Sequence, residues 1–211
     1  NTYNKHDLSR VSTRKIKEIQ RLGPHEKFVG MPCVIKEKYQ EGLEEKSLKT
    51  TLIFYDTCGK LSQEDVYDEN DTYSYSTFFE YDENGYLKEK TNPLGKTESY
   101  SYDKLGNLLF FKKGTLSTYN TFDHSNRLTH IEEKGEEGAI HHTRYRYDYK
   151  HNRIAHTDFL GNTTSFTYDL MGNIIEKQEP LIFSSDGTPI KTHSRSAYNS
   201  QGKEIFSCAS N

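Results

Sequence analysis

A tyrosine followed by an aspartate recurs along this chain at intervals of 20 to 30 residues, which is the mark of an internal repeat. Six such pairs occur among 211 residues. Five of them form a series with two degenerate copies, and its members are Tyr55-Asp56, Tyr81-Asp82, Tyr102-Asp103, Phe122-Asp123, Tyr147-Asp148, Tyr168-Asp169 and Tyr198-Asn199. The sixth pair, Tyr67-Asp68, lacks the rest of the pattern and stands outside the series.

A residue that tolerates positive φ stands three places after each aspartate position of the series. These residues are Gly59, Gly85, Gly106, Asn126, His151, Gly172 and Gly202. A left-handed backbone costs most residues roughly 1–2 kcal/mol, and glycine, asparagine and histidine are among the types that tolerate it best. The aspartate side chain can accept hydrogen bonds from backbone N–H groups just ahead of it. The pattern therefore predicts a hairpin turn at each aspartate, with a left-handed residue at its end.

The residues on both sides of these turns alternate with a period of two, which indicates β-strands. Aromatic pairs such as Phe79 with Tyr81 and Phe166 with Tyr168 precede the turn. An aliphatic residue returns two places after the left-handed position, at Leu61, Leu87, Leu108, Leu128 and Ile174. Arg153 and Glu204 occupy that place in two copies, so we expect those two strands to be shifted or bulged.

A second kind of turn separates successive motifs, at Asn92-Pro93-Leu94-Gly95 and at Asp158-Phe159-Leu160-Gly161. Two distant parts of the chain thus share one layout of turn, strand, turn and strand. One such unit buries too little apolar surface to offset its conformational entropy, so neighbouring units must support it. We therefore predict an all-β fold, a continuous antiparallel ribbon of hairpins over residues 51–206.

Two copies of the pattern resemble the Rhs/YD-repeat family closely, and their sequences are TNPLGKTESYSYDKLGNL at 91–108 and TDFLGNTTSFTYDLMGNI at 157–174. The resemblance implies a ribbon that is part of a spiral shell, which in bacteria commonly encloses a C-terminal toxin or effector. It implies neighbouring repeats and an enclosed toxin domain as partners, and a secreted or cell-surface location. Some members act at cell surfaces, so a carbohydrate- or protein-binding module is the alternative. The Asp-Pro dipeptide of the family's self-cleavage region is absent here, and we expect this chain to be a segment of a longer protein.

The ends of the chain follow the repeat less clearly. Residues 1–50 are expected to be a divergent N-terminal segment or the strands that lead into the ribbon, and 207–211 a tail. Residues 28–39 are predicted to be a strand. Ile16, Ile19 and Leu22 are spaced for either a short helix or a poorly patterned strand.

Nothing in the sequence indicates a catalytic, cofactor or metal site. Histidines gather at His124, His130, His141, His142, His151 and His156, but on a polar ribbon we expect most of them to face solvent. Each motif offers a single aspartate, whereas a calcium loop needs several oxygens in one short segment. The net charge of −3, without a basic stripe, argues against nucleic acid as the main partner. No apolar run approaches the roughly 18 residues of a membrane span.

Overall fold

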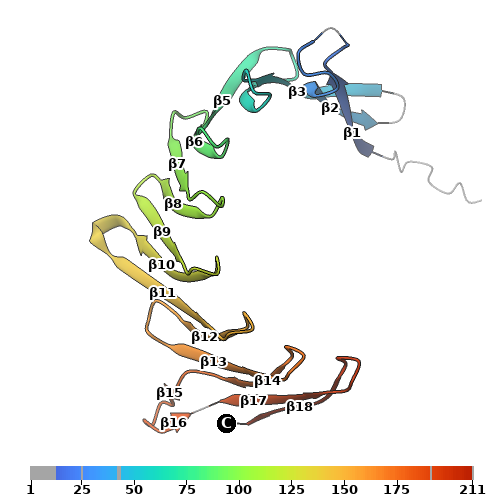
Figure 1. Cartoon of the computed structure of the whole chain (residues 1–211). Helices are drawn as coiled ribbons and strands as arrows, with labels where there is room; N and C mark the ends of the chain where they lie inside the picture. The colour runs from blue at the N-terminus through green and yellow to red at the C-terminus, as the bar shows by residue number, and fades with distance from the viewer. Residues whose placement is uncertain (1–12, 25, 42–43, 191, 211) are drawn as a thin grey trace, which may run out of the picture. The chain divides into compact units, whose positions relative to one another are not determined.

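The computed structural model describes residues 13–24, 26–41, 44–190 and 192–210, and nearly all of them lie in antiparallel strands and the turns between them (Figure 1). The predicted all-β class and ribbon of hairpins are confirmed. The one helical segment in these ranges is the short 3-10 turn η1 (Glu136–Gly138), so they hold no helix that could span a membrane. The chain forms two compact units, which divide between Ser99 and Tyr100.

In the first unit, each strand pairs with the next one in the chain, and every pairing is antiparallel. The strands are β1 (Thr13–Arg21), β2 (Pro32–Glu41), β3 (Glu44–Tyr55), β4 (Leu61–Tyr67), β5 (Tyr73–Tyr81), β6 (Leu87–Thr91) and β7 (Thr97–Tyr102), the last of which runs past the division.

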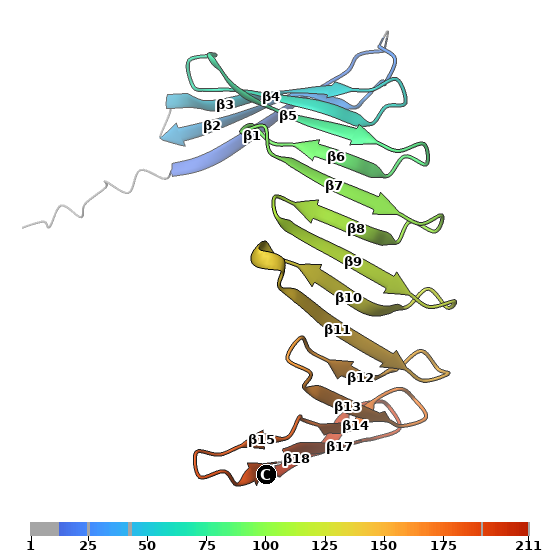
Figure 2. The same cartoon turned by 90° about the vertical axis from the view of Figure 1, so that its left-hand side faces the viewer.

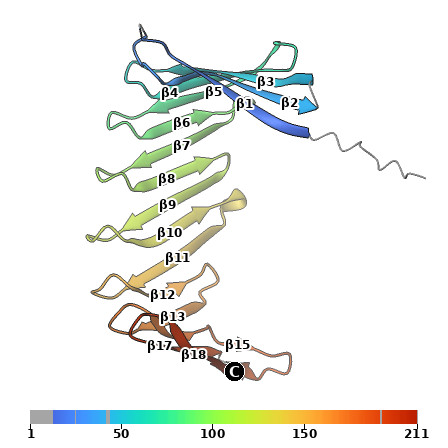
Figure 3. The same cartoon turned by 90° about the vertical axis from the view of Figure 1, so that its right-hand side faces the viewer.

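The second unit is also an antiparallel meander, with one interruption where a two-stranded hairpin, β15–β16, is inserted between β14 and its partner β17. Its strands are β8 (Leu108–Lys113), β9 (Leu116–Phe122), β10 (Leu128–Lys134), β11 (Ile140–Tyr147), β12 (Arg153–Thr157), β13 (Thr163–Tyr168), β14 (Ile174–Gln178), β15 (Ile182–Phe183), β16 (Pro189–Ile190), β17 (His193–Tyr198) and β18 (Glu204–Ser210). The turns after β9, β11 and β13 lie on one side of this unit, and those after β8, β10 and β12 on the other (Figures 2 and 3).

The ribbon has almost no core. Among the described residues, Ala155 at 7% exposure and Thr50 at 8% are the only ones that count as buried. A single twisted sheet covers neither of its faces, so nearly all of its side chains stay half-buried or exposed. The hairpins must therefore be held by their backbone ladders and by contacts between neighbouring turns.

The first strands show how the ends relate to the repeat. Ile16 and Ile19 lie in β1, so this segment is a strand rather than a helix. The strand predicted for residues 28–39 is wrong at its start, because β2 begins at Pro32 and Phe28 lies in the preceding turn. Of the segments expected at the two ends, residues 1–12, 25, 42–43 and 211 lie outside the described residues.

Candidate functional site

The repeated turns are all built in the same way, as the first of them shows. The Asp56 carboxylate Oδ1 accepts hydrogen bonds from the N–H groups of Cys58 at 2.8 Å and Lys60 at 2.9 Å. The Asp56 N–H donates to the Lys60 carbonyl, and the Gly59 N–H donates to the Asp56 carbonyl. The same four bonds recur at Asp82, Asp103, Asp123, Asp148, Asp169 and Asn199. Within each unit, the turns of this series lie along one edge of the sheet, which we call the YD edge.

The last position of each turn has a left-handed backbone. Gly59, Gly85, Gly106 and Gly172 have φ between 83° and 88°. Asn126 and His151 take the same conformation, with φ of 64° and 70°. The three residue types at this position therefore share one backbone shape.

The opposite edge uses the same turn in three places, at Asp68, Asn92 and Asp158. Tyr67-Asp68 stands outside the sequence series, yet its turn has the same bonds as the turns of the series. Asp71 takes the left-handed position with φ 57°, as aspartate can because its short polar side chain tolerates this region. A search that admitted aspartate beside glycine, asparagine and histidine would have found this turn.

A β-bulge follows the turns of the YD edge. At six of them two residues oppose one on the facing strand, as Arg153 and Ile154 oppose Tyr147. The equivalent irregularity occurs beside Tyr55, Tyr81, Phe122, Tyr168 and Tyr198. Bulges were expected only beside Arg153 and Glu204, so this expectation was too narrow. Because two positions oppose each motif aromatic, the aliphatic residue can occupy either one.

The motif tyrosine reaches from its own hairpin to the previous one. Tyr147 Oη donates to the Leu128 carbonyl at 2.9 Å, and Tyr168 Oη donates to the Arg153 carbonyl at 2.8 Å. Tyr55 and Tyr198 donate in the same way to Pro32 at 2.6 Å and to Ile174 at 3.1 Å. Each acceptor is the first residue of a bulge, where the ladder is disturbed. The tyrosine is thus a hydrogen-bonded link between successive hairpins.

The degenerate copy at Phe122 has no hydroxyl, and another side chain supplies the missing bond. Asn120 stands two residues earlier on the same face of β9, and its Nδ2 donates to the Leu108 carbonyl at 2.9 Å. Leu108 occupies the same place after its turn as Leu128 and Arg153 do. The link between hairpins is therefore kept, with an amide in place of a phenol.

A second link joins neighbouring turns along the YD edge, through the residue that follows the left-handed position. Arg127 Nη1 donates to the Asp148 carbonyl at 2.9 Å, and its guanidinium lies 4.9 Å from the centroid of the Tyr147 ring. Lys60 donates to the Gly85 carbonyl, and its ammonium lies 5.1 Å from the Tyr81 ring centroid. A cation over a ring adds about 0.5–1 kcal/mol at an exposed site. Sequence reasoning missed both side chains, because their position holds different residue types in different copies, with asparagine at Asn107, Asn152 and Asn173.

The first hairpin shows the same construction in divergent form. Gly30 is left-handed with φ 80°, and Pro32 stands two places after it. The β1–β2 ladder shifts between Gln20 and Arg21, and the Pro32 carbonyl accepts the Tyr55 hydroxyl. The link from Tyr55 thus extends the repeat to the hairpin that precedes the first recognisable motif.

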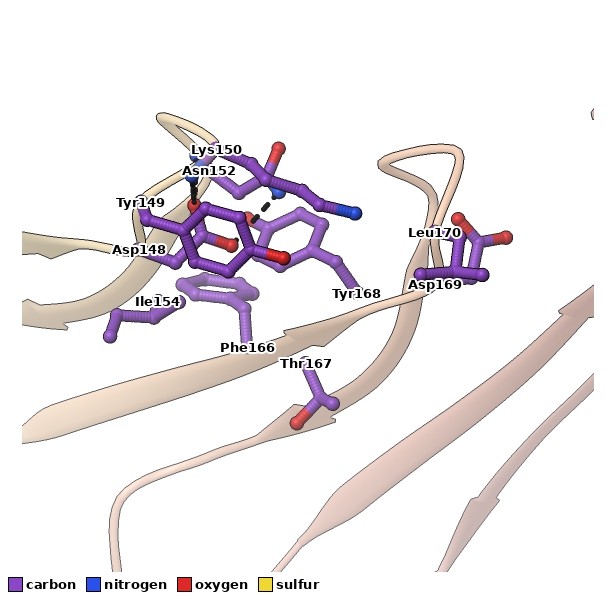
Figure 4. A pocket seen from close by; sticks show the side chains of 10 residues that line it. All are labelled: Asp148, Tyr149, Lys150, Asn152, Ile154, Phe166, Thr167, Tyr168, Asp169 and Leu170. Carbon is purple, nitrogen blue, oxygen red and sulfur yellow. Dashed lines mark hydrogen bonds between the residues drawn. The ribbon is translucent and has the colours of Figure 1, made fainter.

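Shallow hollows lie between consecutive turns of the YD edge. One, of about 290 Å³, is lined by Tyr149, Phe166 and Tyr168 together with Asp148 and other residues of the two turns (Figure 4). Another, of about 330 Å³, lies between the turns that begin at Asp56 and Asp82. Both are open to solvent, and their aspartates are already engaged by backbone N–H groups.

The hydrogen bonds of the turns hold several aspartates in the ionised form. The Arg127 guanidinium, with two backbone N–H groups, lowers the pKa of Asp123 to about 2. Side-chain amides at the same position, Asn107 and Asn173, lower the pKa of Asp103 and Asp169. Burial raises the pKa of Asp148, but the bonds from Asn152 and the backbone outweigh it and the net shift is downward. Carboxylates that are engaged in this way are poor general bases.

No three histidine, cysteine, aspartate or glutamate side chains converge as metal ligands in the part of the chain that the structure describes. The histidines are less exposed than expected. His130 and His142 are half-buried and lie against each other, and His156 stacks on Tyr145. His124 and His151 are exposed in their turns.

Comparison with known proteins places a repeat in the middle of the chain. Residues 81–109 match the family model described as RHS Repeat, which confirms the predicted resemblance at that segment. No curated protein sequence matches the chain. Among solved structures, it is similar to one described as TcdB2-TccC3-Cdc42, with 12% identity and a TM-score of 0.47, and to a Tc holotoxin pore from Photorhabdus luminescens, with 13% identity and a TM-score of 0.46. Each match covers 95% of this chain and 14% of the other.

Proposed function

We propose that this chain, whose residues 81–109 are an RHS repeat, is a non-catalytic structural segment of an Rhs-type β-shell. In this proposal residues 51–206 form part of the wall, and the hairpin of β1 and β2 is a divergent repeat that leads into it. The complete shell encapsulates or presents a C-terminal toxin or effector, and it works in a secreted or cell-surface protein.

The link made by the motif tyrosine is the observation that carries the proposal. Tyr147 and Tyr168 each fix one hairpin to the previous one through a backbone carbonyl, so the contact does not depend on what side chain the acceptor carries. The Arg153 carbonyl can therefore accept this hydrogen bond as well as the Leu128 carbonyl does. A repeat joined in this way extends by adding hairpins rather than by enlarging a core, which suits a thin wall.

The chemistry of the edge supports a structural role rather than catalysis. Asp148 Oδ1 accepts two backbone N–H bonds, and its Oδ2 accepts the Asn152 amide at 3.0 Å. Both carboxylate oxygens of Asp103, Asp123 and Asp169 are engaged in the same way, so these groups have little capacity left to take a proton from a substrate.

Electron microscopy of the complete natural protein that contains this chain would test the proposal. We expect a hollow particle with residues 51–206 in its wall and with any following domain protected from trypsin. Replacing Tyr147 and Tyr168 by phenylalanine together should make that domain cleavable. A solid particle, or a following domain that trypsin cleaves in the unmodified protein, would contradict the shell.

One observation favours a second function, a carbohydrate-binding surface. Tyr149 is 86% exposed and stands with Phe166 and Tyr168 around the hollow of about 290 Å³. Exposed rings of this kind can stack on sugars. A glycan array probed with the folded chain tests this, with Tyr149→Ala as the matched control. Equal signals from the two proteins, or none, would remove it.

A further inference from the structure

Two histidines meet across the β10–β11 ladder of the second unit. Glu132 is the register partner of His142, and Arg144 is the partner of His130, so the two histidines are diagonal neighbours. Their ring planes differ by 19°, and the centroids lie 5.2 Å apart. His130 Nε2 and His142 Nδ1 are 3.0 Å apart, which is a hydrogen bond whose proton one ring holds and the other accepts.

The two facing nitrogens lie close to the spacing that a shared metal ion requires. Imidazole nitrogens bind Zn²⁺ at about 2.0–2.1 Å, and in tetrahedral geometry two such ligands are roughly 3.3 Å apart. The pair needs to open by only a few tenths of an ångström, and each ring must rotate so that its lone pair points at the ion rather than at the other ring. Neutral imidazole is the ligand form, so when a metal enters, the ring that donates this bond must carry its proton on its other nitrogen instead.

The surroundings offer one carboxylate near the pair and do not complete the coordination of an ion. Glu132 Oε2 lies 3.9 Å from His142 Nδ1, and Lys134 lies 3.0 Å from the other carboxylate oxygen of Glu132. Arg144 stands opposite His130 in the ladder. One carboxylate and two cations therefore surround the pair, so these charges do not by themselves attract a cation, and the ring nitrogens would have to supply the affinity. Water molecules would fill the remaining coordination positions, as in open zinc sites.

The other histidines of the central cluster lack this arrangement. His141 points from the opposite face of β11 and packs edge-on against Phe159, with centroids 4.9 Å apart. His156 stacks on Tyr145 at 5.1 Å. Neither of these two contacts brings a pair of imidazole nitrogens together, as the contact of His130 and His142 does.

We propose that His130 and His142 bind one divalent transition-metal cation of the zinc, nickel and copper class. Imidazole suits these metals, whereas magnesium and calcium prefer oxygen ligands. The ion would connect the β9–β10 hairpin to the β11–β12 hairpin, and it would stabilise the folded ribbon because it binds the folded state in preference to the unfolded one. This proposal is independent of whether the ribbon belongs to a shell.

Calorimetric titration of the full chain with ZnCl₂ tests the site, with His130→Gln and His142→Gln as the altered proteins. We expect binding of one Zn²⁺ per chain, weakened by at least about tenfold in each variant, since loss of a ligand costs no less than loss of a ligand's supporting group. His141→Gln is the matched control on the neighbouring residue and should bind as the unmodified chain does. Titration with MgCl₂ should give no binding at this site.

Thermal unfolding provides a second readout that also checks folding. Zn²⁺ should raise the Tm of the unmodified chain and of His141→Gln, and should leave His142→Gln unchanged, although all three give the same β-sheet circular dichroism without metal. Equal Zn²⁺ affinity in His142→Gln and the unmodified chain would overturn the proposal. So would Zn²⁺ binding that His141→Gln weakens as much as His142→Gln does.

Discussion

The Tyr147 hydroxyl donates a hydrogen bond to the Leu128 carbonyl oxygen at 2.9 Å, from one hairpin of the ribbon to the previous one. The two residues are 19 positions apart in the sequence and stand on β11 and β10. The acceptor lies at a bulge, where the regular ladder is disturbed. The bulge and the tyrosine are thus two parts of one connection, repeated along the YD edge.

Removing this hydroxyl should weaken the ribbon by about 1 kcal/mol, the usual net contribution of one hydrogen bond. Tyr147→Phe keeps the ring beneath Arg127 and leaves the Leu128 carbonyl without this donor. Urea unfolding followed by circular dichroism measures the change. Tyr149→Phe is the matched control, because Tyr149 is 86% exposed, and it should change the free energy of unfolding by less than about 0.5 kcal/mol. Equal effects of the two changes would show that the link contributes nothing.

The degenerate copy offers a stricter test of the same connection. Asn120→Ala should cost about 1 kcal/mol, because the Leu108 carbonyl loses its amide donor. Adding Phe122→Tyr to this variant should restore most of the loss, since it places a hydroxyl where the other copies have one. In the unmodified chain, Phe122→Tyr should have little effect, because Asn120 already occupies the acceptor. A double-mutant cycle in urea measures the coupling, and additive effects would contradict the interpretation.

The turns were predictable from the sequence because they are local. An aspartate and a left-handed residue three places later define each turn, and the bonds that Asp148 makes within its own turn reach only as far as Asn152. The alternation of Phe166 and Tyr168 likewise fixes a strand without knowledge of its partner. The all-β class and the order of the hairpins follow from these local features.

The connections between hairpins were not predictable, because they depend on register and use the backbone as acceptor. Nothing in the identity of Arg153 indicates that its carbonyl receives the Tyr168 hydroxyl. Asn120 donates the bond that a tyrosine at position 122 would make, and this is evident only once both positions are known to lie on the same face of β9. The His130–His142 contact was missed for the same reason, since a diagonal pair forms only in one register of β10 and β11.

The left-handed turn position gives a prediction about backbone shape. Gly172 has φ 87°, and a Cβ added there would meet only the Asn152 side chain at an ordinary 3.6 Å. Gly172→Ala should therefore destabilise the ribbon by about 1–2 kcal/mol through the backbone alone. Gly172→Asn should cost clearly less, because asparagine tolerates this conformation and occupies it natively at Asn126. Urea midpoints compare the variants, and an equal loss from both would point to crowding instead.

The response to acid follows from the turn aspartates. Hydrogen bonding from Arg127 lowers the pKa of Asp123 to about 2, against about 3.9 in an unfolded chain. A group with a lowered folded pKa binds protons more readily when unfolded, so its contribution is present above about pH 4 and is lost as the pH falls toward 2. The urea midpoint of the chain should be nearly flat from pH 7 to 5 and should decline below pH 4.

Two variants test the role of Asp123. Asp123→Asn should keep the turn, because asparagine forms the same turn at Asn92 and Asn199. The difference in urea midpoint between Asp123→Asn and the unmodified chain should therefore shrink as the pH falls to 2. Arg127→Met should reduce the acid sensitivity in the same way, and a difference that stays constant from pH 6 to 2 in both variants would contradict this account.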